Sequence, residues 1–229
     1  MNPKIDGISS MATRAVLAEL AAAYERRSGC TVAIESVGGV DAAKRVQAGE
    51  ALDVVVLASD AIDRLIAAGR VVTGSRVDLV HSPVAIAVRS GSPRPDVSTE
   101  AALRQAVETA RSIGHSTGPS GTHLAGLFER WGIAGHLRDR IVQPPPGVPV
   151  GSLVARGEVE LGFQQLSELM HLEGIDVLGT LPPGCDFTTT FSAGLCTASA
   201  QPAAVRVMLD FMSSPAADEA KRRHGMAPA

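Results

Sequence analysis

The sequence predicts an α/β fold with mainly parallel sheets. Over the first 90 residues, short apolar runs alternate with segments whose apolar residues recur at helical spacing. Residues 52–57 form a nearly continuous apolar run, which is typical of a strand buried on both faces of a parallel sheet. Gly29, Gly49 and Gly69 follow the helical segments, where glycine commonly ends a helix. This β-α-β-α-β-α order indicates an α/β architecture.

The first part of the chain supplies three such strand–helix units. Strands are expected at residues 5–8, 31–35 and 52–57, and a long strand pattern over 77–89 is broken at Ser82-Pro83. The intervening helices have these inward positions: Val16, Leu17, Leu20 and Tyr24 in the first, a pattern over 40–47 in the second, and Ile62, Leu65 and Ile66 in the third.

The middle of the chain repeats the alternation after a turn-rich connector at 91–95. Helices are expected at 100–110, from the turn at 118–121 onward, and at 151–155. Strands are expected at 112–116, 141–142, 159–163, 177–179 and 188–193, with a rigid loop at 144–149. A helix from Pro202 and a polar helix over 215–224 end the chain.

Two lobes follow from this order. Residues 1–83 with 190–229 form the first and residues 84–189 form the second, with crossing strands near 84–88 and 188–195. Ligands of open α/β sheets lie beyond the carboxyl ends of the strands. The sequence therefore predicts a ligand cleft between the lobes.

Composition restricts the partners. Aromatic residues make up 3% and the net charge is −3, so base-stacking surfaces and a basic face for nucleic acid are not expected. The three cysteines and six histidines show no metal-ligand spacing. We expect reduced thiols, no metal site and no cofactor.

The chain also shows no membrane-spanning apolar run and no secretory leader before Ile5. We therefore expect no membrane insertion and a cytoplasmic location for the chain as given. A periplasmic location is the alternative if a leader has been removed.

Three small-residue turns precede predicted helices and suggest a site for a small anion. They are Ile8-Ser9-Ser10-Met11, the stretch Ser36 to Arg45 with Gly38 and Gly39, and His115 to Thr122. Backbone N–H groups in the first turn of a helix lack partners within the helix, and the helix dipole favours a negative charge there.

Three longer stretches show a family resemblance. They are residues 17–29 (LAELAAAYERRSG), 47–59 (QAGEALDVVVLAS) and 151–163, where a short helix is followed by RGEVELGF. Together they resemble the type II periplasmic binding proteins, specifically the molybdate-binding branch, over nearly the whole chain. The resemblance implies the two-lobed type II fold and an oxyanion held by serine hydroxyls and backbone N–H groups.

The resemblance assigns the first serine to Ser9 or Ser10, and the second-lobe contact to the Ser120-Gly121-Thr122 turn and Val148. The chain departs from the pattern where family members usually carry a serine in the turn after the second strand, since it has Val37-Gly38-Gly39 there. It departs again where a tyrosine is common, since it has Gln164 or Gln165.

Residues 7–14 (GISSMATR) and 36–43 (SVGGVDAA) are similar to aconitate isomerases, an enzyme class built on the same architecture. This resemblance implies a cofactor-free isomerase that moves a double bond in a small unsaturated polycarboxylate by an allylic proton shift. The alternative is a solute-binding protein of an ABC transporter for molybdate, tungstate or another small oxyanion. Only this alternative implies a permease as partner.

A tricarboxylate needs several donors and a cation, and an allylic shift needs one base near neutral pH. Arg14 and Lys44 are the candidate cations, although solvated side chains are the alternative reading for both. The candidate bases are Lys44, Asp41, His115 at a strand end and His123, which is expected in the first turn of its helix. The alternative is that both histidines are exposed or capping residues and that Asp41 is a first-turn helix acid.

Overall fold

A computed structural model describes residues 3–145 and 147–229. Met1, Asn2 and Pro146, which belong to the expected leaderless start and the expected loop at 144–149, lie outside the described residues. The chain divides into two compact units. The first runs to Ser82 and resumes from Thr190 to Ala229, and the second is Pro83–Thr189.

The first unit is built on three parallel strands, β1 (Lys4–Ser10), β2 (Thr31–Val37) and β3 (Val54–Ala58), in the order β2-β1-β3. In this register Ser9 lies opposite Ser36 on β2 and Val56 on β3. Strand β9 (Thr188–Leu195) pairs antiparallel with β3. The mainly parallel α/β architecture expected from the alternating pattern is confirmed.

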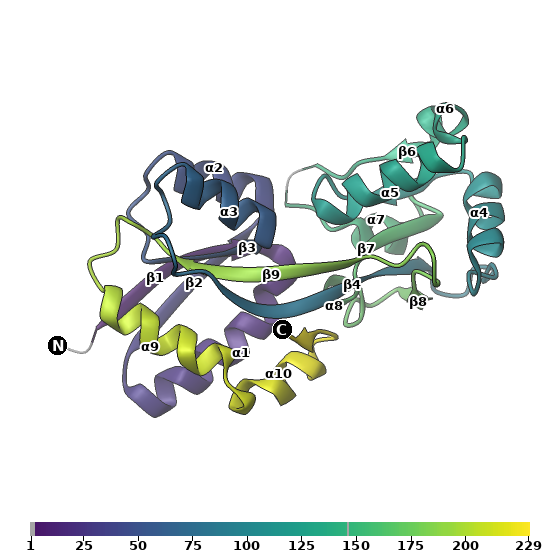
Figure 1. The fold of residues 1–229 in the computed structure, drawn as a ribbon. Coiled ribbons are helices and arrows are strands. Elements are labelled where there is room, and N and C mark those ends of the chain that lie inside the picture. The colour runs from purple at the N-terminus through teal and green to yellow at the C-terminus, as the bar shows by residue number, and fades with distance from the viewer. Residues whose placement is uncertain (1–2, 146) are drawn as a thin grey trace. The chain divides into compact units, whose positions relative to one another are not determined.

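Helices cover both faces of this sheet (Figure 1). On one face lie α1 (Arg14–Ser28), α9 (Pro202–Ser213) and α10 (Asp218–Arg223), with Val54 and Val56 in the same hydrophobic cluster. On the other face α2 (Gly39–Gln47) and α3 (Ser59–Ala67) pack on Val55 and Leu57. Side chains alternate between faces along a strand, so β3 must be apolar throughout, which explains its continuous apolar run.

The second unit has a parallel core of β7 (Leu161–Gln165), β5 (Ile113–His115) and β6 (Ile141–Val142) in that order. Strand β4 (Val77–Arg89) enters from the first unit and pairs antiparallel with β7 and with β8 (Ile175–Thr180). Helices α4 (Glu100–Thr109), α5 (Pro119–Arg130) and α6 (Ala134–Leu137) supply one layer. The other layer contains α7 (Val150–Arg156) and α8 (Leu166–Leu169).

Two elements differ from the sequence expectation. Strand β4 is continuous through Ser82-Pro83, because an extended backbone accommodates the φ angle of proline and the strand changes partners there. His81 pairs with β10 (Ala227–Pro228), whereas Val84 pairs with β7. The final polar helix is instead a 3₁₀ turn, η3 (Pro215–Ala217), followed by α10, in which Lys221 is fully buried.

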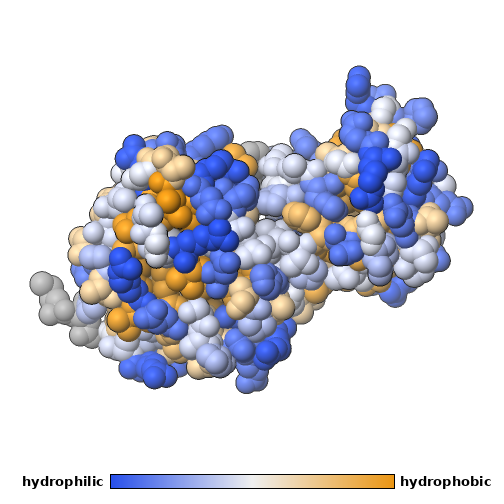
Figure 2. All heavy atoms as spheres, in the orientation of Figure 1, coloured by the Kyte–Doolittle hydropathy of each residue, from blue (hydrophilic) through white to orange (hydrophobic). Residues whose placement is uncertain are grey.

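The surface is of mixed polarity. Figure 2 shows hydrophobic residues grouped on one face of the first unit with hydrophilic residues around them. The large apolar side chains most exposed among residues 3–145 and 147–229 are Val40, Met170 and Val207. In the same part of the chain, no helix has the length and apolar character needed to cross a bilayer.

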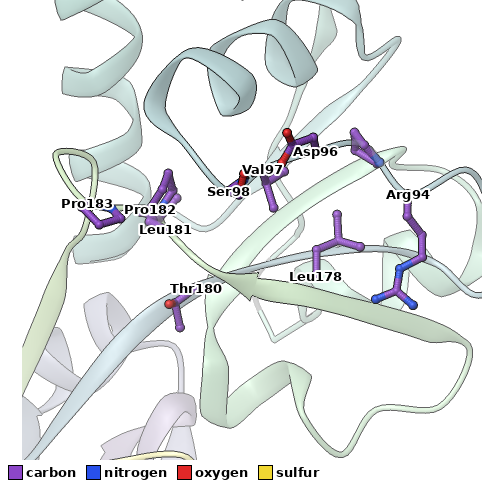
Figure 3. Close-up of a pocket in the computed structure, with 10 residues that line it drawn as sticks. Arg94, Asp96, Val97, Ser98, Leu178, Thr180, Leu181, Pro182 and Pro183 are labelled. Carbon is purple, nitrogen blue, oxygen red and sulfur yellow. Dashed lines mark hydrogen bonds between the residues drawn. The ribbon is translucent and has the colours of Figure 1, made fainter.

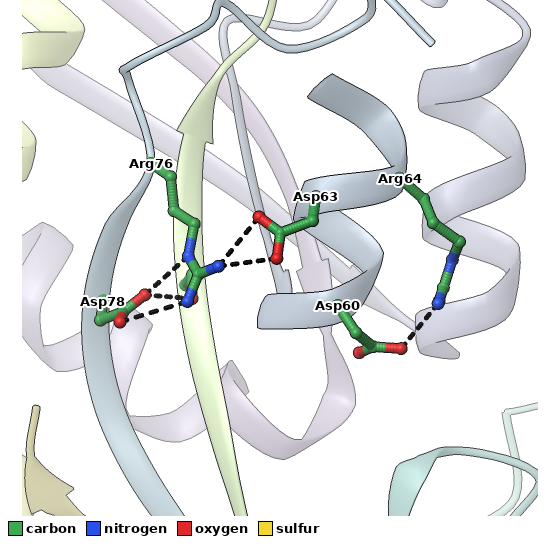
Figure 4. A network of polar contacts seen from close by, with 6 residues as sticks. Asp60, Asp63, Arg64, Arg76 and Asp78 are labelled. Carbon is green, nitrogen blue, oxygen red and sulfur yellow. Dashed lines mark hydrogen bonds and ion pairs between the residues drawn. The ribbon is translucent and has the colours of Figure 1, made fainter. Parts of the chain in front are cut away.

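An arginine joins three elements of the first unit (Figure 4). Arg76 donates to Asp63 of α3 at 2.8 and 2.9 Å and to Asp78 of β4 at 2.9 Å. Asp78 also accepts a hydrogen bond from Ser192 of β9 at 2.6 Å. The hydrogen bond from Arg76 holds the pKa of Asp78 below its ordinary value. Asp60 and Arg64 form a separate pair within α3.

We predict that Asp78→Asn destabilises the protein by about 1 kcal/mol at pH 7, after discounting for the partial exposure of both partners. A lowered carboxylate pKa stabilises the fold above its unfolded value, and this contribution is lost as the pH falls through the folded-state pKa. The difference between variant and wild type should therefore shrink at pH 3. Urea unfolding at both pH values measures it.

Asp60→Asn is the matched control, because its exposed pair lies within one helix and should change stability by less than about 0.5 kcal/mol. Equal effects of the two substitutions at pH 7 would contradict the role given to Asp78.

Candidate functional site at the helix starts

In the first unit, the carboxyl ends of the three parallel strands lead directly into helices. Strand β1 is followed by a 3₁₀ turn, η1 (Met11–Thr13), and α1, β2 by α2, and β3 by α3. Parallel strands end at one edge of their sheet, so the helix starts gather there. This edge therefore offers several first-turn N–H groups to an anion.

Two serines lie side by side at this edge. Ser9 is fully buried, and its Oγ is 2.8 Å from the Oγ of Ser36 on the neighbouring strand. Ser10 caps the following turn, because its Oγ accepts a hydrogen bond from the Ala12 N–H at 3.4 Å. Ser36 opens the glycine stretch predicted to hold an anion, but it was not itself assigned as a contact. The parallel register that places it opposite Ser9 could have identified it, once the strand was extended to Val37.

Helix α2 begins at the glycine turn without a side-chain cap. A Cβ atom added to Gly39 would lie 3.7 Å from the Oγ of Ser10, so Gly39 borders the β1 turn. Asp41 is in the first turn, as expected, and lies 3.9 Å from the Nζ of Lys44. The Lys44 side chain is 74% exposed, and Arg14 is also exposed at the start of α1. The side chains of Lys44 and Arg14 are therefore both solvated in this structure.

In the second unit, a short connection joins β5 to α5, and the first turn of α5 packs on this connection. Ser120 is buried, with its Oγ 3.1 Å from the Oγ of Ser116. A Cβ atom on Gly121 would lie 1.6 Å from the carbonyl oxygen of Ser116. Only glycine fits this contact. The α5 start has no side-chain cap, and Thr122 follows on the exposed side.

The two candidate histidines of this region are both bonded to backbone carbonyls. The Nδ1 of His115 lies 3.0 Å from the oxygen of Ser116, and the buried ring packs edge-on against Phe128. His123 is the fifth residue of α5, past the expected first turn, because the helix begins at Pro119. Its Nε2 lies 3.0 Å from the oxygen of Cys185, and its ring stacks on Phe187. A carbonyl only accepts, so each of these nitrogens carries a proton.

A buried glutamine connects two helix starts of the second unit. Gln164 is the penultimate residue of β7. Its Oε1 accepts a hydrogen bond from the Gly151 N–H in the first turn of α7 at 3.1 Å. Its Nε2 donates to Oε1 of Glu168 in α8 at 2.7 Å. Both ends of the Gln164 amide are therefore engaged inside the protein.

Glu168 is a titratable group that the sequence reasoning missed. Burial raises its pKa to about 7, and the hydrogen bond from Gln164 opposes this rise only in part. Leu166 and Leu169 of the same helix belong to a hydrophobic cluster. A glutamate in a short helix after a buried strand was the available signal, but it has no distinctive spacing.

The remaining predicted positions lie nearby in the second unit. Val148 is half-buried in the segment before α7 and packs against a cluster that includes Val150. Gln165 is buried, and its Nε2 donates to the Oγ1 of Thr189 at 2.8 Å. Among the described residues, no group of three or more histidine, cysteine or acidic side chains is arranged to hold a metal ion.

A pocket of about 410 Å³ lies elsewhere in the second unit (Figure 3). Its lining comes from residues 94–98, which follow β4, and from Leu178 and residues 180–183. It contains none of the predicted site residues and no helix start that follows a parallel strand.

Comparison with known proteins identifies the family. The sequence profile of the bacterial extracellular solute-binding protein family matches residues 5–227. The chain belongs to this family. Its fold is that of the type II periplasmic binding proteins, as the resemblance implied.

Two solved structures of this fold are similar to the chain. The periplasmic molybdate-binding protein of Azotobacter vinelandii matches with a TM-score of 0.79 and 19% identity, over 97% of this chain and 98% of that one. The sulfate-binding protein SubI of Mycobacterium tuberculosis H37Rv matches with a TM-score of 0.80 and 17% identity, over 100% of this chain and 88% of that one.

An enzyme is more similar to this chain in sequence than these two binding proteins are. An aconitate isomerase of a Pseudomonas species is 37% identical over 227 residues, which cover 96% of this chain and 86% of that protein. The proteins similar to this chain thus include both binding proteins and an isomerase.

We predict that Gly121→Ala prevents stable folding of the second unit, or costs more than about 3 kcal/mol, because the new methyl group overlaps the Ser116 carbonyl. Gly126→Ala is the matched control in the same helix, since open space surrounds its Cβ position. That change should stabilise α5 by about 0.5–1 kcal/mol. Thermal unfolding monitored by circular dichroism compares them, and a Gly121→Ala protein as stable as wild type contradicts the contact.

We also predict that Glu168→Gln makes the protein more stable than wild type at pH 8, by about 1–3 kcal/mol, and has little effect at pH 4. The pKa of Glu168 rises from 4.5 to about 7 on folding, so the glutamate favours the folded state fully below pH 4.5. That advantage is lost as the pH rises through about 7.

Urea unfolding at pH 4 and pH 8 measures this difference. Glu173→Gln, at an exposed position beyond α8, is the control and should change stability by less than about 0.5 kcal/mol at both values. Loss of stability in Glu168→Gln at pH 8 would show that the carboxylate is not strained by burial.

Proposed function

We propose that the protein is a cofactor-free isomerase that moves the double bond of a small unsaturated polycarboxylate, with aconitate as the preferred substrate. The single observation that carries the proposal is the 37% identity to an aconitate isomerase over 96% of the chain. The helix starts provide the chemistry that several carboxylates require, namely first-turn N–H groups and serine hydroxyls.

The proposed reaction is an allylic proton shift. A base removes a proton from the methylene carbon of aconitate, and the electron pair spreads over three carbons and the adjoining carboxylates. The proton is then returned to the carbon at the other end, so the double bond has moved and the composition is unchanged. N–H groups that hold the carboxylates also stabilise the charge that develops on them.

The glycine turn favours a carbon skeleton over a compact ion. Gly38 and Gly39 stand where the resemblance implies a serine, and neither brings a side chain to the start of α2. Removing a hydroxyl takes away one donor for a tetrahedral oxyanion and leaves room for a larger ligand. Binding of molybdate or another oxyanion for an ABC transporter is the second candidate, supported by the fold shared with oxyanion-binding proteins.

The deciding experiment incubates the purified protein with trans-aconitate and, separately, with cis-aconitate, and follows both isomers by ¹H NMR. We expect the same equilibrium mixture from either side. Isothermal titration calorimetry with molybdate, tungstate and sulfate is run on the same preparation. Absence of any conversion together with tight oxyanion binding would replace the isomerase by the transport function.

We predict that Gly39→Ser folds normally, because its Cβ position has no neighbour closer than 3.7 Å, and that it lowers kcat/KM for aconitate by about tenfold, equivalent to about 1.4 kcal/mol. The added hydroxyl narrows the turn beside Ser10 and supplies an oxyanion donor. Steady-state kinetics and molybdate calorimetry measure the change in preference.

Gly126→Ala, in a different helix with open space around it, is the control and should leave kcat/KM unchanged. If Gly39→Ser alters neither turnover nor ligand choice, the glycine turn is not part of the site.

A further inference from the structure

Glu168 is a titratable residue near the helix starts, and the proposed reaction has not yet given it a role. It follows the carboxyl end of β7, the same edge from which α5 leaves β5. A single glutamine side chain separates it from the first turn of α7, through contacts of 2.7 Å to Glu168 and 3.1 Å to Gly151. Gln164 therefore links the carboxyl group of Glu168 to the Gly151 N–H at the start of α7.

One of its oxygens is engaged and the other is available. Oε1 accepts the hydrogen bond from Gln164. Oε2 forms no hydrogen bond with residues 3–145 or 147–229. It is also not among the side-chain atoms that are both fully enclosed and unpaired. The residue is half-buried. Oε2 is therefore partly exposed, and Gln164 fixes the orientation of the carboxyl group.

The charged groups on the surrounding elements are engaged elsewhere or lie at the surface. Arg156 of α7 pairs with Glu158, and Asp176 of β8 accepts from Ser90. His171 and Glu173 follow α8 at exposed positions. Within the described chain, no ion pair to Glu168 is formed. Burial is the main cause that raises its pKa to about 7, the range in which one group both accepts and returns a proton efficiently at neutral pH.

We propose that Glu168 is the base of the allylic shift, taking the proton from the methylene carbon of the bound polycarboxylate through Oε2 and returning it to the far carbon. This inference rests on the proposed isomerase function. In the first step the C–H bond breaks, an O–H bond forms on Glu168, and the electron pair stays on the three-carbon unit. In the second step the O–H bond breaks and a C–H bond forms at the other end.

Gln164 acts as a positioning residue in this scheme. Its Oε1 accepts the hydrogen bond from the Gly151 N–H, so its Nε2 faces Glu168. If the amide were reversed, its Nε2 would face the Gly151 N–H, and two donors would then oppose each other. The glutamine thus supports the ionised carboxylate and leaves Oε2 for the substrate carbon.

Glu168→Gln separates catalysis from structure, because the new amide oxygen can still accept from Gln164. We expect kcat at pH 8 to fall by about 100-fold or more with aconitate, as loss of a general base requires, while KM changes by less than about threefold. In D₂O the variant should also lose deuterium incorporation into aconitate. Glu173→Gln is the matched control and should keep the wild-type kcat and KM.

The pH profile and a shortened side chain provide readouts that a purely structural role would not change. Wild-type kcat/KM should rise with pH through an apparent pKa of about 7, the value to which burial raises Glu168. Glu168→Asp should keep part of the activity and shift this rising limb. If ionisation of the substrate caused the rising limb of the pH profile, the limb would lie at the same pH in Glu168→Asp as in wild type.

The outcomes distinguish the two proposals. Active wild type with a Glu168→Gln variant whose kcat stays within about threefold overturns the assignment of Glu168 and leaves the isomerase function intact. Wild type without turnover of either aconitate isomer overturns the function and this inference together. If Glu168→Gln does not fold, the Glu168→Asp profile decides, and an unshifted limb overturns the assignment.

Discussion

The first-turn N–H groups of helices that follow parallel strands are the constraint on which the site depends. A parallel sheet directs the carboxyl ends of its strands to one edge, and each short connection delivers a helix start there. At α2 and α5 no side chain caps the start, and glycine and other small residues stand in both first turns. The fold therefore brings helix-start N–H groups to this edge before any particular side chain is chosen.

Close backbone packing makes this arrangement rigid. The first turn of α5 contacts the Ser116 carbonyl so closely that residue 121 must be glycine. In the first unit, the hydroxyls of Ser9 and Ser36 bond across adjacent strands. In the second, Gln164 is fixed at both ends of its amide. Sites with so little freedom hold a ligand with small loss of conformational entropy, and they also define where a proton-transferring group can stand.

Many elements could be predicted because their patterns are local. The apolar run of β3, the inward positions Leu20 and Tyr24 of α1, and the glycine turn before α2 all act within a few residues. The errors are equally instructive. Pro83 did not break β4, since a change of pairing partners accommodates it, and Lys221 is buried although its helix reads as polar.

The sequence by itself determined the α/β class, the family resemblance and the positions of the small-residue turns, because helical and strand periodicity and turn chemistry are properties of neighbouring residues. Tertiary structure alone decided which groups meet. It places Ser36 beside Ser9 through the strand register, directs the ring nitrogens of His115 and His123 to carbonyl oxygens, and desolvates Glu168 next to Gln164. Burial and long-range hydrogen bonding set the pKa of a carboxyl group, and neither can be read from its sequence neighbours.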